Sequence, residues 1–220
     1  MPPGSAVANV GIGVLGLFHP RQLTVSALQG RALVVRSGDE RVVLEHSSGV
    51  HTASVRLSGS EIIVQLGTRT VRASGLTAAG RKDEPADFVL AVPGKIARHY
   101  RGTLEIRRSA GHLLAIVTME RETAVASIVA AESTTETPFE ALKAQSVATR
   151  SYLVASRGRH RDFDFCDTTH CQFLREPPTP AQPSRKPSRP RETWFLPTNP
   201  SRSPPCTRGA AQGARTRRKS

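Results

Sequence analysis

Residues 112–132, HLLAIVTMERETAVASIVAAE, contain the point at which the hydrophobic pattern of the chain changes. The first part, up to Thr118, is a short run of apolar and β-branched residues, which is typical of a strand. From Glu120 to Glu132 the chain is rich in Ala and Glu and contains neither Gly nor Pro, which predicts a helix. A β-rich region that gives way to helices indicates an α+β fold.

Upstream of this point, from about Val10 to Met119, apolar and polar residues alternate with a period of two. Gly-rich segments separate the apolar runs at intervals of about ten residues, which predicts short antiparallel strands. The expected strands are Leu23–Ala27, Val42–Leu44, Ala53–Leu57, Glu61–Gln65, Phe88–Val92, Gly102–Arg108 and His112–Thr118. The Ser109-Ala110-Gly111 sequence predicts a hairpin between the last two.

Downstream, Thr137–Glu140 has the composition of a helix start, with Thr at the N-cap and Pro at the first helical position. The second helix should run to about Ser156, before Gly158. We expect its buried stripe to consist of Phe139, Leu142, Val147 and Leu153 or Val154. The predicted fold is therefore α+β, with a β-rich antiparallel N-terminal region followed by a two-helix segment.

The chain of 220 residues has 31 Lys/Arg and 18 Asp/Glu, a formal net charge of +13. Residues 176–220 contain ten Lys/Arg, two Asp/Glu and 10 of the 16 prolines, so this segment contributes +8 and residues 1–175 contribute only +5. The composition predicts a folded domain over 1–175 and a Pro/Arg-rich tail over 176–220. Because no aromatic platform or recognition motif accompanies the charge, we expect no nucleic-acid partner.

The N-terminus contains a 13-residue apolar stretch, Ala6–Phe18. No basic segment precedes it and no small-residue cleavage site follows it, so it is not a convincing signal peptide. A membrane-spanning helix needs about 20 apolar residues, so we expect no transmembrane span in this chain.

Two segments carry a family resemblance: AAESTTETPFEALKAQSVATRSYLVAS at 130–156 and FDFCDTTHCQ at 163–172. They resemble the turn, helix and Cys…His-Cys-Gln segment of the stage II sporulation protein D family (the SpoIID/LytB domain). The resemblance extends over roughly Val10 to Leu174. It implies a lytic transglycosylase that cleaves peptidoglycan glycan strands lacking stem peptides. The alternative, since other members are described as enhancers of cell-wall amidases, is a non-catalytic cell-wall module that activates an amidase.

The resemblance also implies roles for residues. Glu132 matches the catalytic glutamate, and Lys143 and Arg150 match helix residues needed for activity. These two cations are seven residues apart, so they project from nearly the same side of a helix and are expected to bind substrate. A single acid and base works best with a pKa raised toward neutrality, and the apolar residues 128–131 before Glu132 predict such an environment. Glu136 is expected to be structural.

A cluster of potential metal ligands follows the second helix: His160, Cys166, His170 and Cys171. Thiolates and imidazoles are the usual ligands of structural zinc. Because His170 and Cys171 are adjacent, a three-ligand set of His160, Cys166 and Cys171 is easier to form. His170 or an outside group would complete it. A Cys166–Cys171 disulfide and free thiols are the alternatives.

The family continues with further strands where this chain has its tail. Back-translation in a frame shifted by one base, from about Arg185, reads as a strand-like sequence with a Tyr and a Cys-Ala-Gly segment. We therefore expect a frameshift in the gene or its sequencing; the alternative is a natural basic tail. A protein made without those strands is expected to have weak or no activity. The resemblance implies a periplasmic or cell-wall location.

Overall fold

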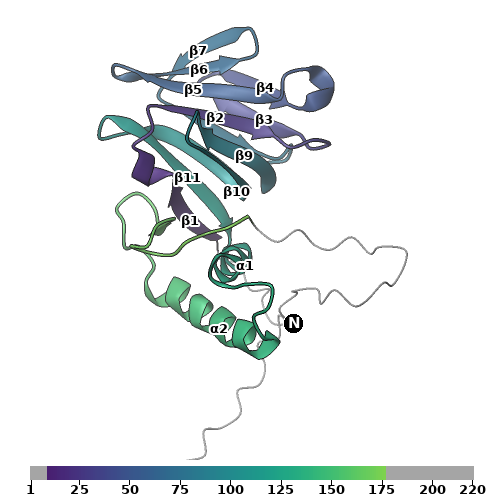
Figure 1. The fold of residues 1–220 in the computed structure, drawn as a ribbon. Helices are drawn as coiled ribbons and strands as arrows, with labels where there is room; N and C mark the ends of the chain where they lie inside the picture. Colours follow the sequence, from purple (N-terminus) through teal and green to yellow (C-terminus); the bar gives the residue numbers. More distant parts are fainter. Residues whose placement is uncertain (1–8, 177–220) are drawn as a thin grey trace, which may run out of the picture.

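The computed structural model describes residues 9–176 (Figure 1). The predicted tail after Glu176, the expected frameshift near Arg185 and the third cysteine, Cys206, lie outside the described residues. So does the beginning of the apolar stretch at Ala6–Phe18.

Most of the described chain is β-structure. The strands are β1 Asn9–Val14, β2 Gln22–Ala27, β3 Leu33–Ser37, β4 Glu40–Leu44, β5 Thr52–Ser58, β6 Glu61–Leu66, β7 Arg69–Ala73, β8 Gly75–Ala79, β9 Ala86–Val92, β10 Ile96–Ser109, β11 His112–Glu120 and β12 Phe165–Cys166. Two short 3-10 helices, Gly16–Phe18 and His46–Ser48, lie between them.

The strands form a continuous sheet in the order β12-β1-β11-β10-β9-β2-β5-β6-β7. Strand β10 is long enough to join two parts of it: residues 96–102 pair with β9, and residues 103–109 pair with β11. Strand β8 pairs with β10 and with β3, which in turn pairs with β4. All of these pairings are antiparallel except β1 with β12, which is parallel.

The expected strands are all present, and the α+β class is confirmed. The predicted hairpin joins β10 to β11 with Ser109 opposite His112. Ala110 and Gly111 both have positive φ, 46° and 83°, as a two-residue turn that matches the twist of the strands requires. Strands β1, β3, β7, β8 and β12 are not among the expected ranges.

The core lies between the inward faces of these strands. Alternate residues are buried along β2 (Leu23, Val25) and along β9 (Phe88, Leu90), as the period of two requires.

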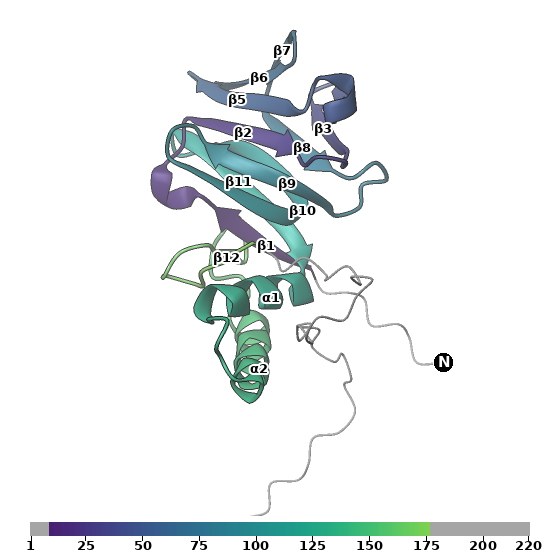
Figure 2. The same ribbon diagram turned by 45° about the vertical axis from the view of Figure 1, so that its right-hand side comes forward.

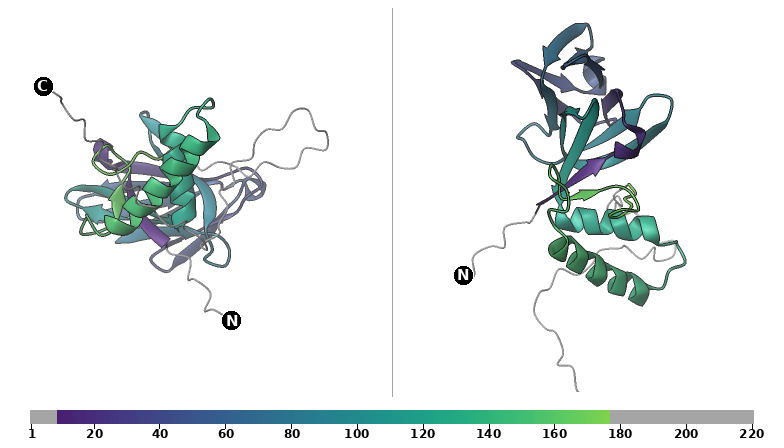
Figure 3. Two further views of the ribbon diagram at one scale, coloured as in Figure 1. Left: turned by 90° about the horizontal axis from the view of Figure 1, so that it is seen from below. Right: turned by 90° about the vertical axis from the view of Figure 1, so that its left-hand side faces the viewer.

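Helix α1, Arg121–Glu132, follows β11 directly, and α2, Phe139–Ala155, follows after a six-residue connection. Both helices lie at one end of the β-structure, with α1 between the strands and α2 (Figures 2 and 3). Helix α1 buries Val125, Ile128 and Val129. Neither helix of the described chain is long and apolar enough to cross a membrane.

Two details of α2 differ from the sequence prediction. The N-cap is Pro138, not Thr137, because Pro138 has extended backbone angles and Thr137 accepts a hydrogen bond from the Thr134 N–H instead. The predicted stripe is correct only for Leu142 and Leu153. The side that faces α1 consists of Leu142, Ser146, Thr149 and Leu153, and leaves Phe139, Val147 and Val154 exposed.

Candidate active site and metal centre

Glu132 is the last residue of α1, and its side chain is exposed. The apolar residues before it, Ile128 and Val129, are buried in the core and do not enclose its carboxylate. The expected apolar environment of this carboxylate is therefore wrong. The reason is geometric, because successive residues of a helix point to different sides.

Gln145, on the second turn of α2, holds the Glu132 carboxylate. Its Nε2 donates a hydrogen bond to Glu132 Oε2 over 2.6 Å, and its Oε1 accepts one from Ser133 Oγ over 3.1 Å. Gln145 is not among the predicted site residues, because it does not share the side of Lys143 and Arg150. A usable signal was present, however: helical side chains lean toward the N-terminus, so Gln145 leans toward the connection that begins at Ser133.

Arg150 forms a bidentate ion pair with Glu122 at the start of α1. Its Nε lies 3.0 and 2.9 Å from the two carboxylate oxygens, and its Nη2 lies 2.7 Å from Oε2. This guanidinium therefore joins α2 to α1. Both side chains are partly buried.

Lys143 lies on the exposed side of α2. Its Nζ donates a hydrogen bond to Glu140 Oε1 over 2.8 Å and lies 4.5 Å from the centre of the Phe139 ring. Lys143 and Arg150 are thus held by different carboxylates and not joined by a common partner among the described residues. Glu136 is exposed in the connection between the helices.

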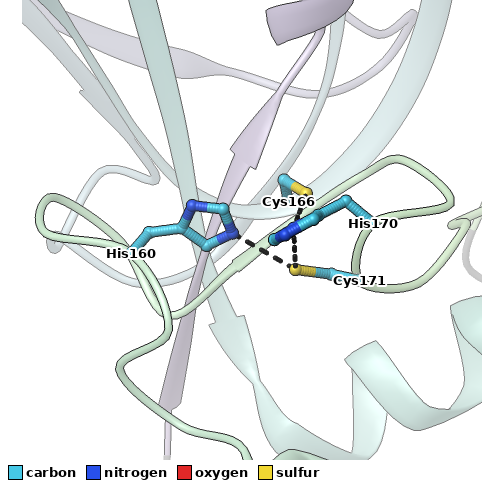
Figure 4. Close-up of side chains that lie close together, drawn as sticks. All are labelled: His160, Cys166, His170 and Cys171. Atoms are coloured by element: carbon cyan, nitrogen blue, oxygen red, sulfur yellow. Dashed lines mark hydrogen bonds between the residues drawn. The ribbon is translucent and has the colours of Figure 1, made fainter.

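The four predicted metal ligands meet in one place (Figure 4). Their potential ligand atoms all lie within 4.8 Å of one another. His160 Nε2 lies 3.2 Å from Cys171 Sγ, and His170 Nδ1 lies 3.6 Å from Cys171 Sγ and 3.8 Å from Cys166 Sγ. Both cysteines are free thiols in the structure. The adjacency of His170 and Cys171 therefore does not keep either side chain out of the cluster.

The strand pairing of β1 brings these ligands together. Strand β12 contains Cys166 and pairs in parallel with β1, so that Gly13 lies opposite Cys166. The Asp164 carboxylate accepts a hydrogen bond from the Gly11 N–H over 2.8 Å. The buried Asp167 carboxylate accepts one from the Leu15 N–H over 3.0 Å. Together these contacts attach residues 163–167 to the first strand of the chain.

Arg98 of β10 completes the attachment, because its Nη1 lies 3.0 Å from Asp167 Oδ2. Burial raises the pKa of Asp167, while the Leu15 N–H and the Arg98 charge act in the opposite direction. An uncompensated carboxylate at a buried position is costly, so these two partners account for the tolerance of Asp167 there.

The cluster is partly shielded from water. Burial lowers the pKa of His160, and the charges of His170 and Arg159 act in the same direction. Burial also raises the pKa of the Cys171 thiol. The His160 ring is stacked on Phe163, with the ring centres 4.4 Å apart.

The donor set fits zinc. In a tetrahedral zinc site the sulfur–nitrogen separation is about 3.5 Å and the sulfur–sulfur separation about 3.8 Å, from the usual bond lengths. The three sulfur–nitrogen distances of 3.2, 3.6 and 3.8 Å are centred on that value. Two thiols and two imidazoles would make a closed site, which is typical of structural zinc.

Comparison with known proteins gives one family match. Residues 109–189 match the family model described as SpoIID, stage II sporulation protein. The matched segment contains Glu132, Gln145 and the His/Cys cluster. Neither curated proteins nor solved structures give a match. The resemblance predicted from the sequence is thus confirmed over residues 109–189.

Proposed function

We propose that this chain cleaves peptidoglycan glycan strands, preferably those without stem peptides, as a lytic transglycosylase with Glu132 as its single acid and base. One observation carries the proposal. The Glu132 carboxylate is exposed at the end of α1, within the SpoIID segment, and an amide holds one of its oxygens. The role of Glu132 itself is taken from the family resemblance.

The chemistry needs one group that gives a proton and then takes one. Protonated Glu132 donates its proton to the glycosidic oxygen as the bond from that oxygen to the muramic acid C1 breaks. The resulting carboxylate then takes the proton from the 6-hydroxyl of the same sugar, whose oxygen bonds to C1 and closes an anhydro ring. Glycoside hydrolases generally use a second carboxylate, either as a nucleophile or as the base that activates water, and this reaction needs none.

Lys143 supports the proposal as a substrate-binding residue. Its ammonium group is on the exposed side of α2, and its partner Glu140 is a surface residue. Exposed pairs of this kind are weak, so a polar or anionic group of the glycan can replace Glu140. For Arg150, the bidentate pair with Glu122 favours a role in holding α2 in place over direct substrate binding.

The His/Cys cluster is proposed to hold structural zinc, with His160, Cys166, His170 and Cys171 as ligands. Bound there, the metal would supply a cross-link within residues 160–171 and no step of the cleavage reaction. Its effect on function would be to hold the segment that packs against β1.

The proposed activity can be tested by incubating the full chain with peptide-free glycan strands and measuring anhydromuramic products by mass spectrometry. Glu132→Gln should lower the rate at least about a hundredfold, because a positioned acid and base contributes roughly that much. Glu136→Gln is the matched control, four residues away on the exposed connection, and should leave the rate unchanged. Products with reducing ends, or a Glu132→Gln variant as active as the wild type, would contradict the proposal.

A second candidate function is activation of a cell-wall amidase, which an unpartnered face of α2 favours. Val147 and Val154 are seven residues apart and are 61% and 63% exposed. Seven residues are two helical turns, so these two form an apolar patch suited to a protein partner. In that case Val147→Asp should abolish stimulation of the amidase and Glu132→Gln should not. Either function implies a location outside the cytoplasmic membrane.

A further inference from the structure

We infer that Gln145 is a positioning residue for Glu132, and that it leaves Oε1 as the carboxyl oxygen that carries and delivers the proton. The inference rests on the proposed function and adds to it a division of roles between the two oxygens. Its basis is the 2.6 Å hydrogen bond from Gln145 Nε2 to Glu132 Oε2.

The orientation of the Gln145 amide follows from its two partners. A carboxylate oxygen only accepts hydrogen bonds, so the NH₂ end of the amide must face Glu132 Oε2. The carbonyl end then accepts the hydroxyl proton of Ser133 over 3.1 Å. A reversed amide would place two acceptors 2.6 Å apart, which is repulsive. Ser133 and Glu132 are consecutive residues, so one side chain of α2 fixes the end of α1 at two points.

This arrangement assigns different roles to the two carboxyl oxygens. While Oε2 accepts the amide N–H, a proton on that oxygen would compete with the hydrogen bond, so the proton of the acid form belongs on Oε1. In the first half-reaction the Oε1–H bond breaks and the glycosidic oxygen receives the proton. In the second, Oε1 receives the proton of the 6-hydroxyl. The Gln145 contact is compatible with both halves, which keeps one oxygen directed at the substrate throughout.

The position of Gln145 is itself constrained by the packing of α2. Its neighbours Leu142 and Ser146 are buried against α1, and the Arg150–Glu122 ion pair holds the helix one turn further on. Rotation of α2 would expose Leu142 and Ser146 and break the Arg150–Glu122 ion pair. The amide is therefore attached to a rigid support, as a positioning residue requires.

The kinetic test uses Gln145→Met in the full chain, which keeps the side-chain length and removes both hydrogen bonds. We expect kcat on peptide-free glycan strands to fall about tenfold and KM to change less than about twofold, since misplacing the acid affects the chemical step. Gln65→Met is the matched control. Gln65 also donates one hydrogen bond (2.7 Å, to the Gly67 carbonyl) and accepts one (2.6 Å, from Thr70), but on strand β6.

A spectroscopic test gives a readout independent of turnover. In the ¹⁵N-labelled full chain, the short contact should shift the Gln145 side-chain NH₂ proton downfield, and Glu132→Ala should remove that shift. A Gln145 resonance unaffected by Glu132→Ala would overturn the inference. So would an unchanged kcat in Gln145→Met, provided that Glu132→Gln is inactive. If Glu132→Gln is as active as the wild type, the proposed function itself fails, and the two failures are thus distinguished.

Discussion

At the scale of single residues, Gly13 links the first strand to the His/Cys cluster. A Cβ atom built on Gly13 would lie 2.7 Å from Cζ of Phe163, too close for any real contact. The Phe163 ring in turn stacks on His160, one of the four predicted ligands. The missing side chain of Gly13 therefore makes room for the ring that orients a ligand.

Gly13→Ala should consequently weaken zinc binding more than it destabilises the fold. The Phe163 ring is the end of a side chain and can move, so we expect a stability loss of about 1 kcal/mol. Displacing the ring that supports His160 should lower zinc affinity about tenfold. Gly11→Ala is the control on the same strand, because its Cβ would make only ordinary contacts, the nearest at 3.7 Å. Competition with a chromophoric chelator measures the zinc affinity, and urea denaturation measures the free energy of unfolding. Equal zinc affinities for Gly13→Ala and Gly11→Ala would contradict the role of Gly13 in making room for the Phe163 ring.

The ligands themselves give a second prediction at this scale. Protein purified with zinc present should contain about one zinc per chain, and His160→Ala should lower this content strongly. His112→Ala is the matched control, since His112 lies at the β10–β11 hairpin and outside the cluster. A chelator should lower the unfolding temperature of the wild type, because a bound metal stabilises the folded state by mass action. Zinc content near zero with no effect of the chelator would contradict the zinc site and leave free thiols or a Cys166–Cys171 disulfide.

At the scale of elements, the contacts between α1 and α2 determine where Glu132 lies. Gln145 contacts the end of α1 and Arg150 contacts its beginning, at Glu122. The spacing of Lys143 and Arg150 predicted that both cations bind substrate. The structure instead gives the two cations different carboxylate partners on different elements, α1 for Arg150 and α2 itself for Lys143.

A double-mutant cycle should separate the two cations. For Arg150→Ala with Glu122→Ala we expect a coupling free energy of about 1 kcal/mol, because the pair is bidentate and partly buried. For Lys143→Ala with Glu140→Ala, an exposed pair three residues apart, the coupling should be at most about 0.5 kcal/mol. Urea denaturation of the single and double variants measures both. Equal coupling free energies in the two cycles would contradict the role of Arg150 in holding α2 against α1. Substrate binding would then be the better assignment for Arg150.

Features of this arrangement that depend on local sequence could be predicted, and features that depend on tertiary contacts could not. Helix α1 was predicted to within one residue, because a run without Gly or Pro is a local signal. The prediction of the buried stripe of α2 was partly wrong, since the sequence does not specify which apolar residues of a helix will find a partner. Residue type was enough to predict the cluster. The N-terminal lean of helical side chains directs Gln145 toward the connection after α1. Its contact with Glu132 depends in addition on how the two helices cross, which the sequence does not specify.

At the scale of the whole molecule, the distribution of charge separates two parts of the chain. The buried apolar residues of the described part extend from Val10 to Leu174. Residues 1–176 have 21 Lys/Arg and 17 Asp/Glu, a net charge of only +4 out of +13. A mildly basic domain suits an acidic cell-wall polymer, and most of the basicity belongs to the tail that the composition predicts.

Two truncations test that division of the chain. If the predicted boundary is correct, a chain ending at Glu176 should unfold cooperatively within about 2 °C of the full chain, because it keeps the whole described core. It should also elute from a cation exchanger at much lower salt, since it has lost nine positive charges net. A chain ending at Arg189 keeps the complete SpoIID segment and serves as the comparison. If the longer chain is as stable as the full one and the shorter is not, the domain extends past Glu176 and the predicted boundary is wrong.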